Sequence, residues 1–399
     1  MLTQAVILAG GMGTRLGALT LETPKPLLPI GGQPFLDYVV WNLRRFGINR
    51  LLFSVGYLSE SIIEHFGDGQ RFGVTIDYAV EPRPMGTGGA LKLATDRLDQ
   101  EFLVVNGDTL FDVNYLDLTL SLKTHGSLAG IAMRHITNTG RYGAVNVVDG
   151  LIQDFSEKSK GGPGLINGGV YVMRREALER LPDGPCSLEK NLFPGLAFER
   201  QLAGRAYSGF FIDIGLPATL HEGDRLIPQW KKKRAVLLDR DGVINVDYGY
   251  VHDQEKFVWI EGARDAIKWL NDNGYLAIVI TNQAGIARGY FSEDEFLSFT
   301  SWINNELRMS GAHIDATYFC PHHPTEGIGD YRKACGCRKP GSDLIQNAIT
   351  EWDLDVQHSI LIGDKESDLI AGRNVGIQSV LFNQGNLLET LQAAILTFE

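Results

Sequence analysis

The chain has 399 residues and a formal net charge of −11, with 44% hydrophobic and 21% charged residues. This length suits two domains rather than one core, and the composition is that of a globular protein, not a disordered one. The acidic balance argues against binding a nucleic-acid backbone, which requires a basic face.

No segment is predicted to be a signal peptide or to cross a membrane. The apolar opening, residues 5–8, is too short for a signal peptide, and no stretch approaches the roughly 20 apolar residues that span a bilayer. We therefore expect a soluble cytoplasmic protein with no membrane partner. Three of the four cysteines lie close together, which indicates a metal site rather than a disulfide framework.

Strand and helix patterns alternate along the chain. Short runs rich in Val, Ile and Leu predict buried parallel strands at 5–8, 51–55, 102–105, 235–238, 276–280 and 359–362. One helix is predicted to end at Gly47 and to bury Phe35, Val39, Leu43 and Phe46. Another begins with a capping box of Ser292 and Glu295 and buries Phe296, Phe299, Ile303 and Leu307. This alternation predicts α/β layers with helices on both sheet faces.

The pattern restarts near residue 234, after a polar and basic stretch at 228–234. We predict a first domain over residues 1–228, a linker over 229–234 and a second domain over 235–399. The basic run 231–234 is interpreted as a solvated linker. The alternative, a nucleic-acid patch, is disfavoured by the net charge.

A glycine-rich loop follows the first predicted strand and contains Gly10, Gly11, Gly13 and Arg15. Glycines let the backbone approach a phosphate, whose oxygens can then bind successive N–H groups, and an arginine adds positive charge. The loop follows neither the Walker pattern nor the dinucleotide fingerprint, so alone it is a weak signal.

Three further residues suit phosphate chemistry. Lys25 stands between two prolines that stiffen the chain, either as an exposed lysine or as one held against a transferring phosphate. Asp108 ends one apolar strand, and Asp213 ends a similar segment later. Carboxylates at strand ends suit Mg²⁺, and these two could share one ion.

In this order the segments resemble the sugar-1-phosphate nucleotidyltransferases, over about residues 3–225. The resemblance implies in-line attack of a sugar-1-phosphate on the α-phosphorus of a nucleoside triphosphate, with loss of pyrophosphate. It implies that Lys25 stabilises the transition state and that Asp108 and Asp213 hold Mg²⁺. Nucleotide contacts are implied for Gly10, Gly11, Gly13, Thr14, Arg15, Gly86, Thr87, Gly88 and Gly89. Sugar and phosphate contacts are implied for Glu157, Lys158, Asn167 and Gly168, with a surface ion pair as the alternative for the first two.

The second half opens with Asp239 and Asp241, directly after an apolar strand. Alternate side chains of a strand point the same way, so both acids could meet one phosphate and one metal ion. Two uncompensated carboxylates repel each other, so a bound cation is expected.

With Thr281, Arg338, Lys339 and Asp364 in the order that follows, residues 235–383 resemble the haloacid-dehalogenase phosphatases. The resemblance implies that Asp239 forms an aspartyl-phosphate and that Asp241 acts as acid and then base. Thr281 and Lys339 would hold the phosphoryl group, and Asp239, Asp364 and the backbone carbonyl of Asp241 would hold Mg²⁺. For Asp368 a solvated helix face is expected, with a site role as the weaker alternative.

Cys320, His322, Cys335 and Cys337 form the pattern C-x-H-x₁₂-C-x-C. Three thiolates and one imidazole complete a tetrahedral zinc site, which should therefore be structural and pin the 320–337 loop beside Arg338 and Lys339. Free thiols are the alternative, and His323 could replace His322. Cys186 is expected to be a plain apolar residue.

The zinc pattern narrows the resemblance to heptose-1,7-bisphosphate 7-phosphatases and histidinol-phosphate phosphatases. The segments 247–252, 282–289 and 320–324 resemble the former, with Asn282 and Arg338 as substrate contacts and Arg338 suited to a second phosphate. The first half most resembles the D-glycero-D-manno-heptose 1-phosphate guanylyltransferases.

We therefore expect two Rossmann-like three-layer αβα domains, a nucleotidyltransferase fold and a haloacid-dehalogenase-like fold with a zinc-bound loop. The expected enzyme removes the 7-phosphate of the bisphosphate and then transfers GMP from GTP to heptose 1-phosphate. Open alternatives are a mannose-1-phosphate guanylyltransferase fused to a histidinol-phosphate phosphatase, another nucleotide, and a non-catalytic half. The sequence leaves the oligomeric state open.

Overall fold

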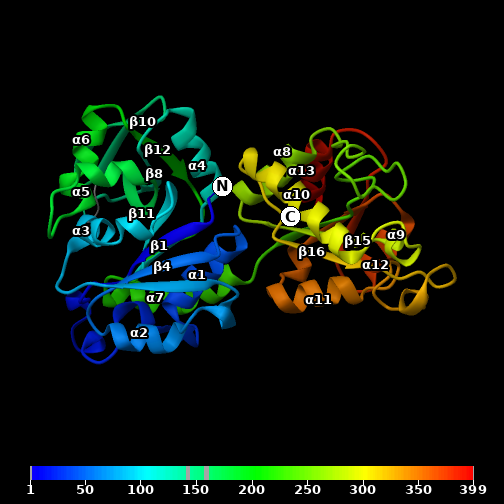
Figure 1. Cartoon of the computed structure of the whole chain (residues 1–399), viewed down its shortest axis with the longest axis horizontal. Helices are drawn as coiled ribbons and strands as arrows, with labels where there is room; N and C mark the ends of the chain where they lie inside the picture. The colour runs from blue at the N-terminus through cyan, green and yellow to red at the C-terminus, as the bar shows by residue number, and fades with distance from the viewer. Residues whose placement is uncertain (1, 141–143, 157–160, 399) are drawn as a thin grey trace. The chain divides into compact units, whose positions relative to one another are not determined.

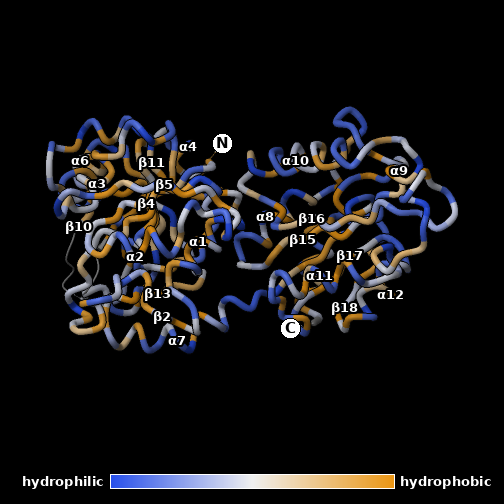
Figure 2. Tube along the Cα trace, turned by 60° about the horizontal axis from the view of Figure 1, so that its bottom comes forward, coloured by the Kyte–Doolittle hydropathy of each residue, from blue (hydrophilic) through white to orange (hydrophobic). Residues whose placement is uncertain are grey.

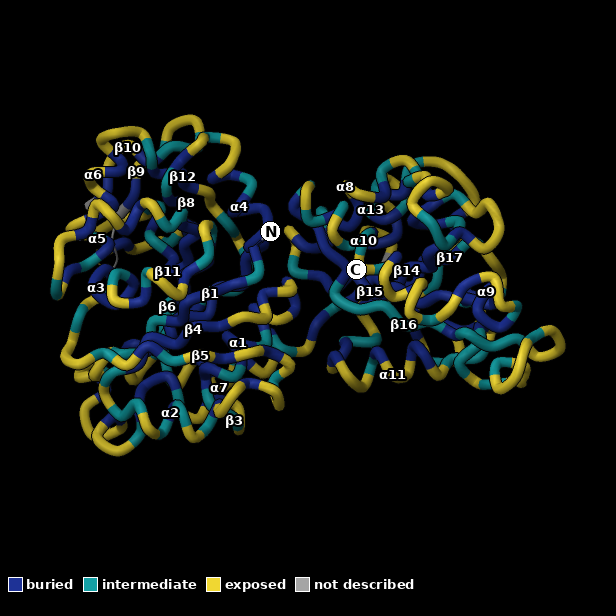
Figure 3. The backbone as a smooth tube through the Cα atoms, in the orientation of Figure 1, coloured by how far each residue is buried: buried dark blue, intermediate teal, exposed yellow. Residues whose placement is uncertain are grey.

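The computed structural model describes residues 2–140, 144–156 and 161–398 and divides the chain into two compact units, Met1–Trp230 and Lys231–Glu399 (Figure 1). Each unit has its own sheet and core. Figure 2 shows hydrophobic residues concentrated along the central strands, and Figure 3 shows those strands as buried, with exposed residues on outer turns and loops.

The first unit contains a nine-stranded sheet in the order β5-β4-β1-β6-β11-β8-β12-β10-β9. Strands β5, β4, β1 and β6 are parallel, whereas β11 runs antiparallel to both of its neighbours, β6 and β8. The strands are β1 (Gln4–Leu8), β4 (Arg50–Val55), β5 (Thr75–Val80), β6 (Glu101–Asn106), β8 (Ala129–Ile136), β9 (Ala144–Val148), β10 (Leu151–Ser156), β11 (Gly164–Arg174) and β12 (Leu202–Tyr207). Two small sheets pair β2 (Pro29–Ile30) with β3 (Gln33–Pro34), and β7 (Thr109–Phe111) with β13 (Phe211–Asp213).

Helices cover both faces of this sheet because its strands are apolar on both sides. Ile7 belongs to one core and its neighbour Val6 to the other, as strand alternation requires. The first core takes side chains from α1 (Phe35–Arg45), α2 (Ser59–Phe66), α4 (Tyr115–Thr124) and α7 (Pro217–Lys231). The second takes them from α3 (Gly86–Leu93), α5 (Leu188–Asn191) and α6 (Phe193–Phe198).

The second unit contains a five-stranded, fully parallel sheet in the order β16-β15-β14-β17-β18. Its strands are β14 (Ala235–Leu238), β15 (Leu276–Asn282), β16 (Ala316–Cys320), β17 (Ile360–Gly363) and β18 (Gln378–Leu381). Helices α8 (Ala263–Asp272), α10 (Glu293–Met309) and α13 (Leu387–Phe398) share one core with Val236 and Leu238. The others are α9 (Ala284–Ala287), α11 (Asp343–Trp352), which contacts β15 and β16, and α12 (Glu366–Arg373), which contacts β17 and β18.

The α/β class is confirmed, and each predicted strand is present with small shifts at its ends. The capping box of Ser292 and Glu295 is also present, and α10 buries the four predicted side chains. The antiparallel strands of the first sheet were not predicted.

The predicted solvated linker over 229–234 is wrong in its local structure. Helix α7 continues to Lys231, and Trp230 is buried, where its indole N–H donates to Asp112 at 2.8 Å. Lys233 is also buried and forms a β-bridge with Leu354. The apolar face of α7, which includes Ile227 and Trp230, packs in the first core, whereas Lys233 pairs within the second unit.

Candidate functional site

A cleft of about 510 Å³ opens at the carboxyl ends of β1 and β6, where ligands of open α/β sheets bind. It brings together most of the predicted residues of the first site. Those on its wall are Gly10, Gly11, Gly13, Thr14, Arg15, Lys25, Gly86, Thr87 and Asp108. Glu81, Asn106 and Gly215 also line it and were not predicted.

The loop after β1 needs its glycines for two reasons. Gly13 has φ of +62°, the left-handed region, and precedes the 3₁₀ helix η1 (Thr14–Thr20). A Cβ on Gly10 would lie 2.3 Å from Glu81 Oε1. Glu81 follows β5 and is held by the Ser54 hydroxyl at 3.1 Å and the Met85 amide at 2.9 Å. Its position after a strand is the same signal that identified Asp108.

Lys25 lies between the two predicted metal-binding carboxylates. It is buried, with Nζ 2.5 Å from Asp108 Oδ2 and 3.9 Å from Asp213 Oδ1. The antiparallel pairing of β7 and β13 places Thr109 opposite Asp213 and so brings the two acids together. Burial, and then the charge of Asp108, raises the pKa of Asp213, against the opposing effect of Lys25. Two carboxylates and a buried cation suit an Mg²⁺–triphosphate complex.

Two of the glycines predicted to contact the nucleotide, Gly88 and Gly89, pack against another segment of the first unit. The amides of Gly88 and Gly89 both donate to the carbonyl of Cys186, at 2.9 and 3.2 Å, and neither residue is among the described residues on the cleft wall. A Cβ on Gly89 would lie 2.6 Å from the Gly184 carbonyl. These glycines therefore allow α3 to pack closely on the 184–186 segment, in which Cys186 is buried.

The predicted sugar contacts are set back from this cleft. Asn167 and Gly168 lie at an irregularity of β11, and Gly168 is buried against Phe111. The next residue, Gly169, packs on Asn106, which does line the cleft. Glu157 and Lys158 lie outside the described residues.

The second cleft, of about 550 Å³, lies at the carboxyl ends of the parallel strands of the second unit. Predicted residues on its wall are Asp239, Asp241, Thr281, Asn282, Arg338 and Lys339. Gln283, Arg288, His323, Lys365 and Asp368 line it as well.

Lys339 is a buried lysine that bridges two acids of this cleft. Its Nζ lies 3.0 Å from Asp239 Oδ1 and 2.7 Å from Asp368 Oδ1, and it donates to the Ile280 carbonyl at 2.7 Å. The Asn282 side chain bonds to both the amide and the carbonyl of Lys339, at 3.0 and 3.1 Å. The expectation that Asp368 faces solvent is wrong, because its side chain is 1% exposed. Helix α12 turns this acid toward Lys339.

The general acid and base predicted from sequence, Asp241, is fixed by three side chains that were not predicted. Arg240 binds its carboxylate at 2.8 Å, and Gln283 and Asn245 each donate to it at 3.0 Å. Arg240 is itself buried, 5.5 Å from the ring centres of Phe296 and Phe299. The Asp241 carboxylate is therefore held in one orientation beside Asp239.

Asp239, Asp364 and Asp368 place carboxylate oxygens within 4.8 Å of one another. Burial, the largest effect, raises the pKa of Asp239 to about 6 despite Lys339, and burial also raises that of Asp364. Asp364 Oδ1 is buried without a hydrogen-bond partner among the described residues. Converging acids with an unpaired buried oxygen fit a divalent cation such as Mg²⁺.

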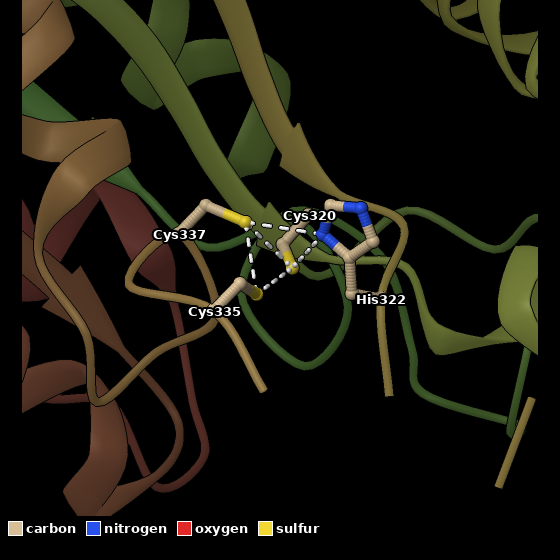
Figure 4. A group of neighbouring side chains, drawn as sticks. All are labelled: Cys320, His322, Cys335 and Cys337. Carbon is tan, nitrogen blue, oxygen red and sulfur yellow. Dashed lines mark hydrogen bonds between the residues drawn. The ribbon is translucent and has the colours of Figure 1, made fainter. Parts of the chain in front are cut away.

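Cys320, His322, Cys335 and Cys337 form a second cluster (Figure 4). Their sulfur atoms lie 3.1–3.6 Å apart, and Nδ1 of His322 lies 3.3 Å from the Cys337 sulfur. Tetrahedral zinc with Zn–S bonds of about 2.3 Å holds its ligands at about 3.7 Å, so these four side chains fit the ion with modest adjustment. His323 faces elsewhere, accepting from the Glu326 amide at 2.9 Å.

Two family models match the chain. The model described as nucleotidyl transferase matches residues 4–221, and one described as HAD-hydrolase-like matches residues 336–395. Among the described residues, no helix has the length and apolar character needed to cross a bilayer.

Curated relatives share sequence with part of the chain. A D-glycero-beta-D-manno-heptose-1,7-bisphosphate 7-phosphatase from Pasteurella multocida is 46% identical over 149 residues, covering 37% of this chain and 80% of the relative. The D-glycero-alpha-D-manno-heptose-1,7-bisphosphate 7-phosphatase from Burkholderia mallei is 49% identical over 150 residues, covering 38% and 79%.

Solved structures resemble the chain over a little more than half its length. HddC from Yersinia pseudotuberculosis has a TM-score of 0.52 and 29% identity, covering 57% of this chain and 100% of that one. The same protein is also known complexed with GMP-PN. A putative glucose-1-phosphate thymidylyltransferase from Bacillus anthracis, 24% identical with a TM-score of 0.52, covers 56% of this chain and 94% of its own and shares the fold.

Proposed function

The chain belongs to the nucleotidyl transferase family through residues 4–221 and to the D-glycero-D-manno-heptose-1,7-bisphosphate 7-phosphatases through its other half, and on this premise we propose that it carries out two consecutive steps on one sugar. The phosphatase hydrolyses the 7-phosphate of heptose 1,7-bisphosphate. The transferase then joins the resulting heptose 1-phosphate to GMP from GTP and releases pyrophosphate. The observation that supports this proposal is the presence of both clefts on one chain.

In the phosphatase cleft, Asp239 attacks the phosphorus while Asp241 donates a proton to the departing C7 oxygen. Asp241 then takes a proton from water, which attacks the aspartyl-phosphate and regenerates Asp239. Lys339 neutralises the phosphoryl oxygens, and Arg240 keeps Asp241 in place. Asp239, Asp364 and Asp368 would hold Mg²⁺, which supplies positive charge against the phosphoryl group. Zinc held by the cysteine cluster would be structural.

In the transferase cleft, the phosphate oxygen of heptose 1-phosphate attacks the α-phosphorus of GTP, and the bond to pyrophosphate breaks. We assign triphosphate binding to the loop from Gly10 to Arg15 and charge neutralisation to Lys25. Asp108 and Asp213 would hold Mg²⁺. GTP is proposed as donor because HddC, which matches the first half, is known with GMP-PN, a guanine nucleotide analogue.

The test is a substrate panel with the purified chain. Each anomer of heptose 1,7-bisphosphate and histidinol phosphate are compared for phosphate release. The four nucleoside triphosphates are then compared for pyrophosphate release, with heptose 1-phosphate or mannose 1-phosphate. We expect kcat/KM to favour the heptose substrates and GTP by at least tenfold. Preference for histidinol phosphate, or for mannose 1-phosphate, would refute the corresponding half of the proposal.

A further inference from the structure

A chain of hydrogen bonds joins the nucleotide side of the first cleft to its predicted sugar side. Glu189, on α5, accepts from the hydroxyl of Thr87 at 2.8 Å and from that of Tyr171 at 3.4 Å. Tyr171 accepts from Nδ2 of Asn167 at 2.9 Å, and Oδ1 of Asn167 accepts from the Gly169 amide at 2.9 Å. Thr87 lines the cleft, and Asn167 belongs to the segment predicted to contact the sugar.

The chemistry of these groups fixes the direction of every bond in the chain. Carboxylate oxygens accept, so Thr87 and Tyr171 must each donate their single hydroxyl proton to Glu189. Thr87 Oγ1 is then left to accept from the Leu188 amide, at 2.9 Å, and Tyr171 to accept from Asn167. The amide of Asn167 is thereby oriented, with its oxygen engaged by Gly169 and, among the described residues, one further N–H left to donate.

Burial makes this arrangement costly to disturb. Tyr171 is 0% exposed, and burial, reinforced by the charge of Glu189, raises its pKa well above the usual range, so the hydroxyl keeps its proton. The Ser187 hydroxyl adds a third donor to Glu189, at 2.6 Å. An unpaired group in such a network loses its solvation without compensation.

We propose that Glu189 is a positioning residue that couples the two substrates of the transferase. It fixes the Thr87 hydroxyl on the nucleotide side and, through Tyr171, presents Asn167 as a donor to hydroxyl or phosphate oxygens of a sugar phosphate. Thr87 and Tyr171 donate to different oxygens of the same carboxylate, Oε2 and Oε1, so a ligand that shifts the carboxylate from one end also moves the acceptor at the other end. This inference rests on the proposed transferase function and deepens it.

The test compares KM for GTP and for heptose 1-phosphate in four variants of the full chain. Glu189→Gln replaces one acceptor by a donor and should raise both KM values about tenfold. Tyr171→Phe should raise mainly the KM for heptose 1-phosphate, and Thr87→Val mainly that for GTP. Thr87→Ser, which keeps the hydroxyl, should recover most of the affinity for GTP. The matched control is Glu64→Gln, an exposed acid on α2, which should change neither value.

Phosphatase activity of the same chain and the Tm of the first unit report whether each variant folds. The inference is overturned if Glu189→Gln leaves both KM values within twofold of wild type. It is also overturned if the three disruptive variants lower kcat alike, with a lower Tm and no difference between substrates. Failure of the wild-type chain to use GTP and heptose 1-phosphate would instead refute the proposed substrates. In that case, the dissociation constant of the triphosphate that does bind is measured for the wild type and for Glu189→Gln. An unchanged constant in Glu189→Gln refutes the coupling.

Discussion

The buried position of Asp368 gives it a role in the second cleft. Its carboxylate contacts Lys339 at 2.7 Å and lies within the cluster that includes Asp239. Asp368→Asn should therefore lower phosphatase kcat by about ten- to a hundredfold and weaken Mg²⁺ binding, because Lys339 loses a charged partner and the ion loses a carboxylate. Phosphate release at several Mg²⁺ concentrations measures both effects. Asp353→Asn, an exposed acid at the end of α11, is the control. A wild-type rate for Asp368→Asn would remove this acid from the site.

The raised pKa of Asp239 predicts competition between protons and metal. Burial moves this pKa from 3.8 up to about 6, so the carboxylate becomes protonated as pH falls through 6, well before an ordinary aspartate does. Binding of Mn²⁺, a probe for the Mg²⁺ site, should weaken about tenfold per pH unit below about 6. Measuring it without substrate avoids titration of the substrate's own phosphate, whose second pKa is also about 6. Asp239→Asn should reduce this dependence to the part contributed by Asp364, whose pKa burial also raises, and a wild-type affinity that is flat from pH 7 to 5 would contradict the assignment.

The sequence identifies most residues of both clefts because acids and glycines that follow apolar strands stand out along the chain. Asp108, Asp239 and Asp364 are found this way. It does not identify Arg240, and it gives Asp368 a site role only as the weaker alternative, because both roles depend on which way a loop or helix face turns. Gly363 is so close to Asp368 that a Cβ there would lie 2.3 Å from the Asp368 Cβ, a contact that no linear pattern reveals.

At the scale of elements, two glycines of similar appearance serve different purposes. Gly89→Ala would force α3 away from the Gly184 carbonyl and should destabilise the first unit by about 1–3 kcal/mol. At Gly11 an added Cβ meets nothing within 4 Å, so Gly11→Ala should leave stability nearly unchanged while weakening nucleotide binding. Thermal unfolding and nucleotide titration of the two variants distinguish these roles. Equal losses of stability in the two variants would contradict the distinction between a packing role for Gly89 and a binding role for Gly11.

The segment that bears Cys320, His322, Cys335 and Cys337 runs from the end of β16 through one short 3₁₀ helix, η6 (Gly329–Tyr331), and we expect it to depend on zinc. Cys337 directly precedes Arg338 and Lys339, which line the second cleft. Cys335→Ser, or removal of zinc by a chelator, should therefore lower the Tm of the second unit and reduce phosphatase activity at least tenfold, with transferase activity kept. Metal analysis and the two activities test this. Full phosphatase activity in a metal-free loop would contradict a structural role for zinc.

Strand prediction succeeded where apolar runs lie in parallel sheets and failed in the antiparallel part of the first sheet. Runs such as 102–105 are apolar on both faces and short, which is distinctive. Strand β11 contains Asn167, Gly168 and Gly169 in its course, and these residues indicate a turn rather than a strand. Pairing with β6 and β8 overrides that local preference.

For the whole molecule, the central claim is that one chain carries two independent sites that act in succession on the same sugar. The two compact units have separate sheets and cores, and each holds one of the two clefts. Substitution in one cleft should therefore leave the other active, and two chains with complementary defects should restore the full conversion through free heptose 1-phosphate.

The most direct measurement uses ³¹P NMR to follow the conversion of heptose 1,7-bisphosphate and GTP in the presence of Mg²⁺. Four samples are compared: the wild-type chain, Asp239→Asn, Lys25→Ala and a mixture of the two variants. The account predicts that Asp239→Asn leaves the bisphosphate intact yet converts added heptose 1-phosphate. Lys25→Ala should accumulate heptose 1-phosphate, and the mixture should form GDP-heptose as the wild type does. If Asp239→Asn still consumes the bisphosphate, or the mixture yields no GDP-heptose while each variant retains its own activity, the account of two consecutive sites is wrong.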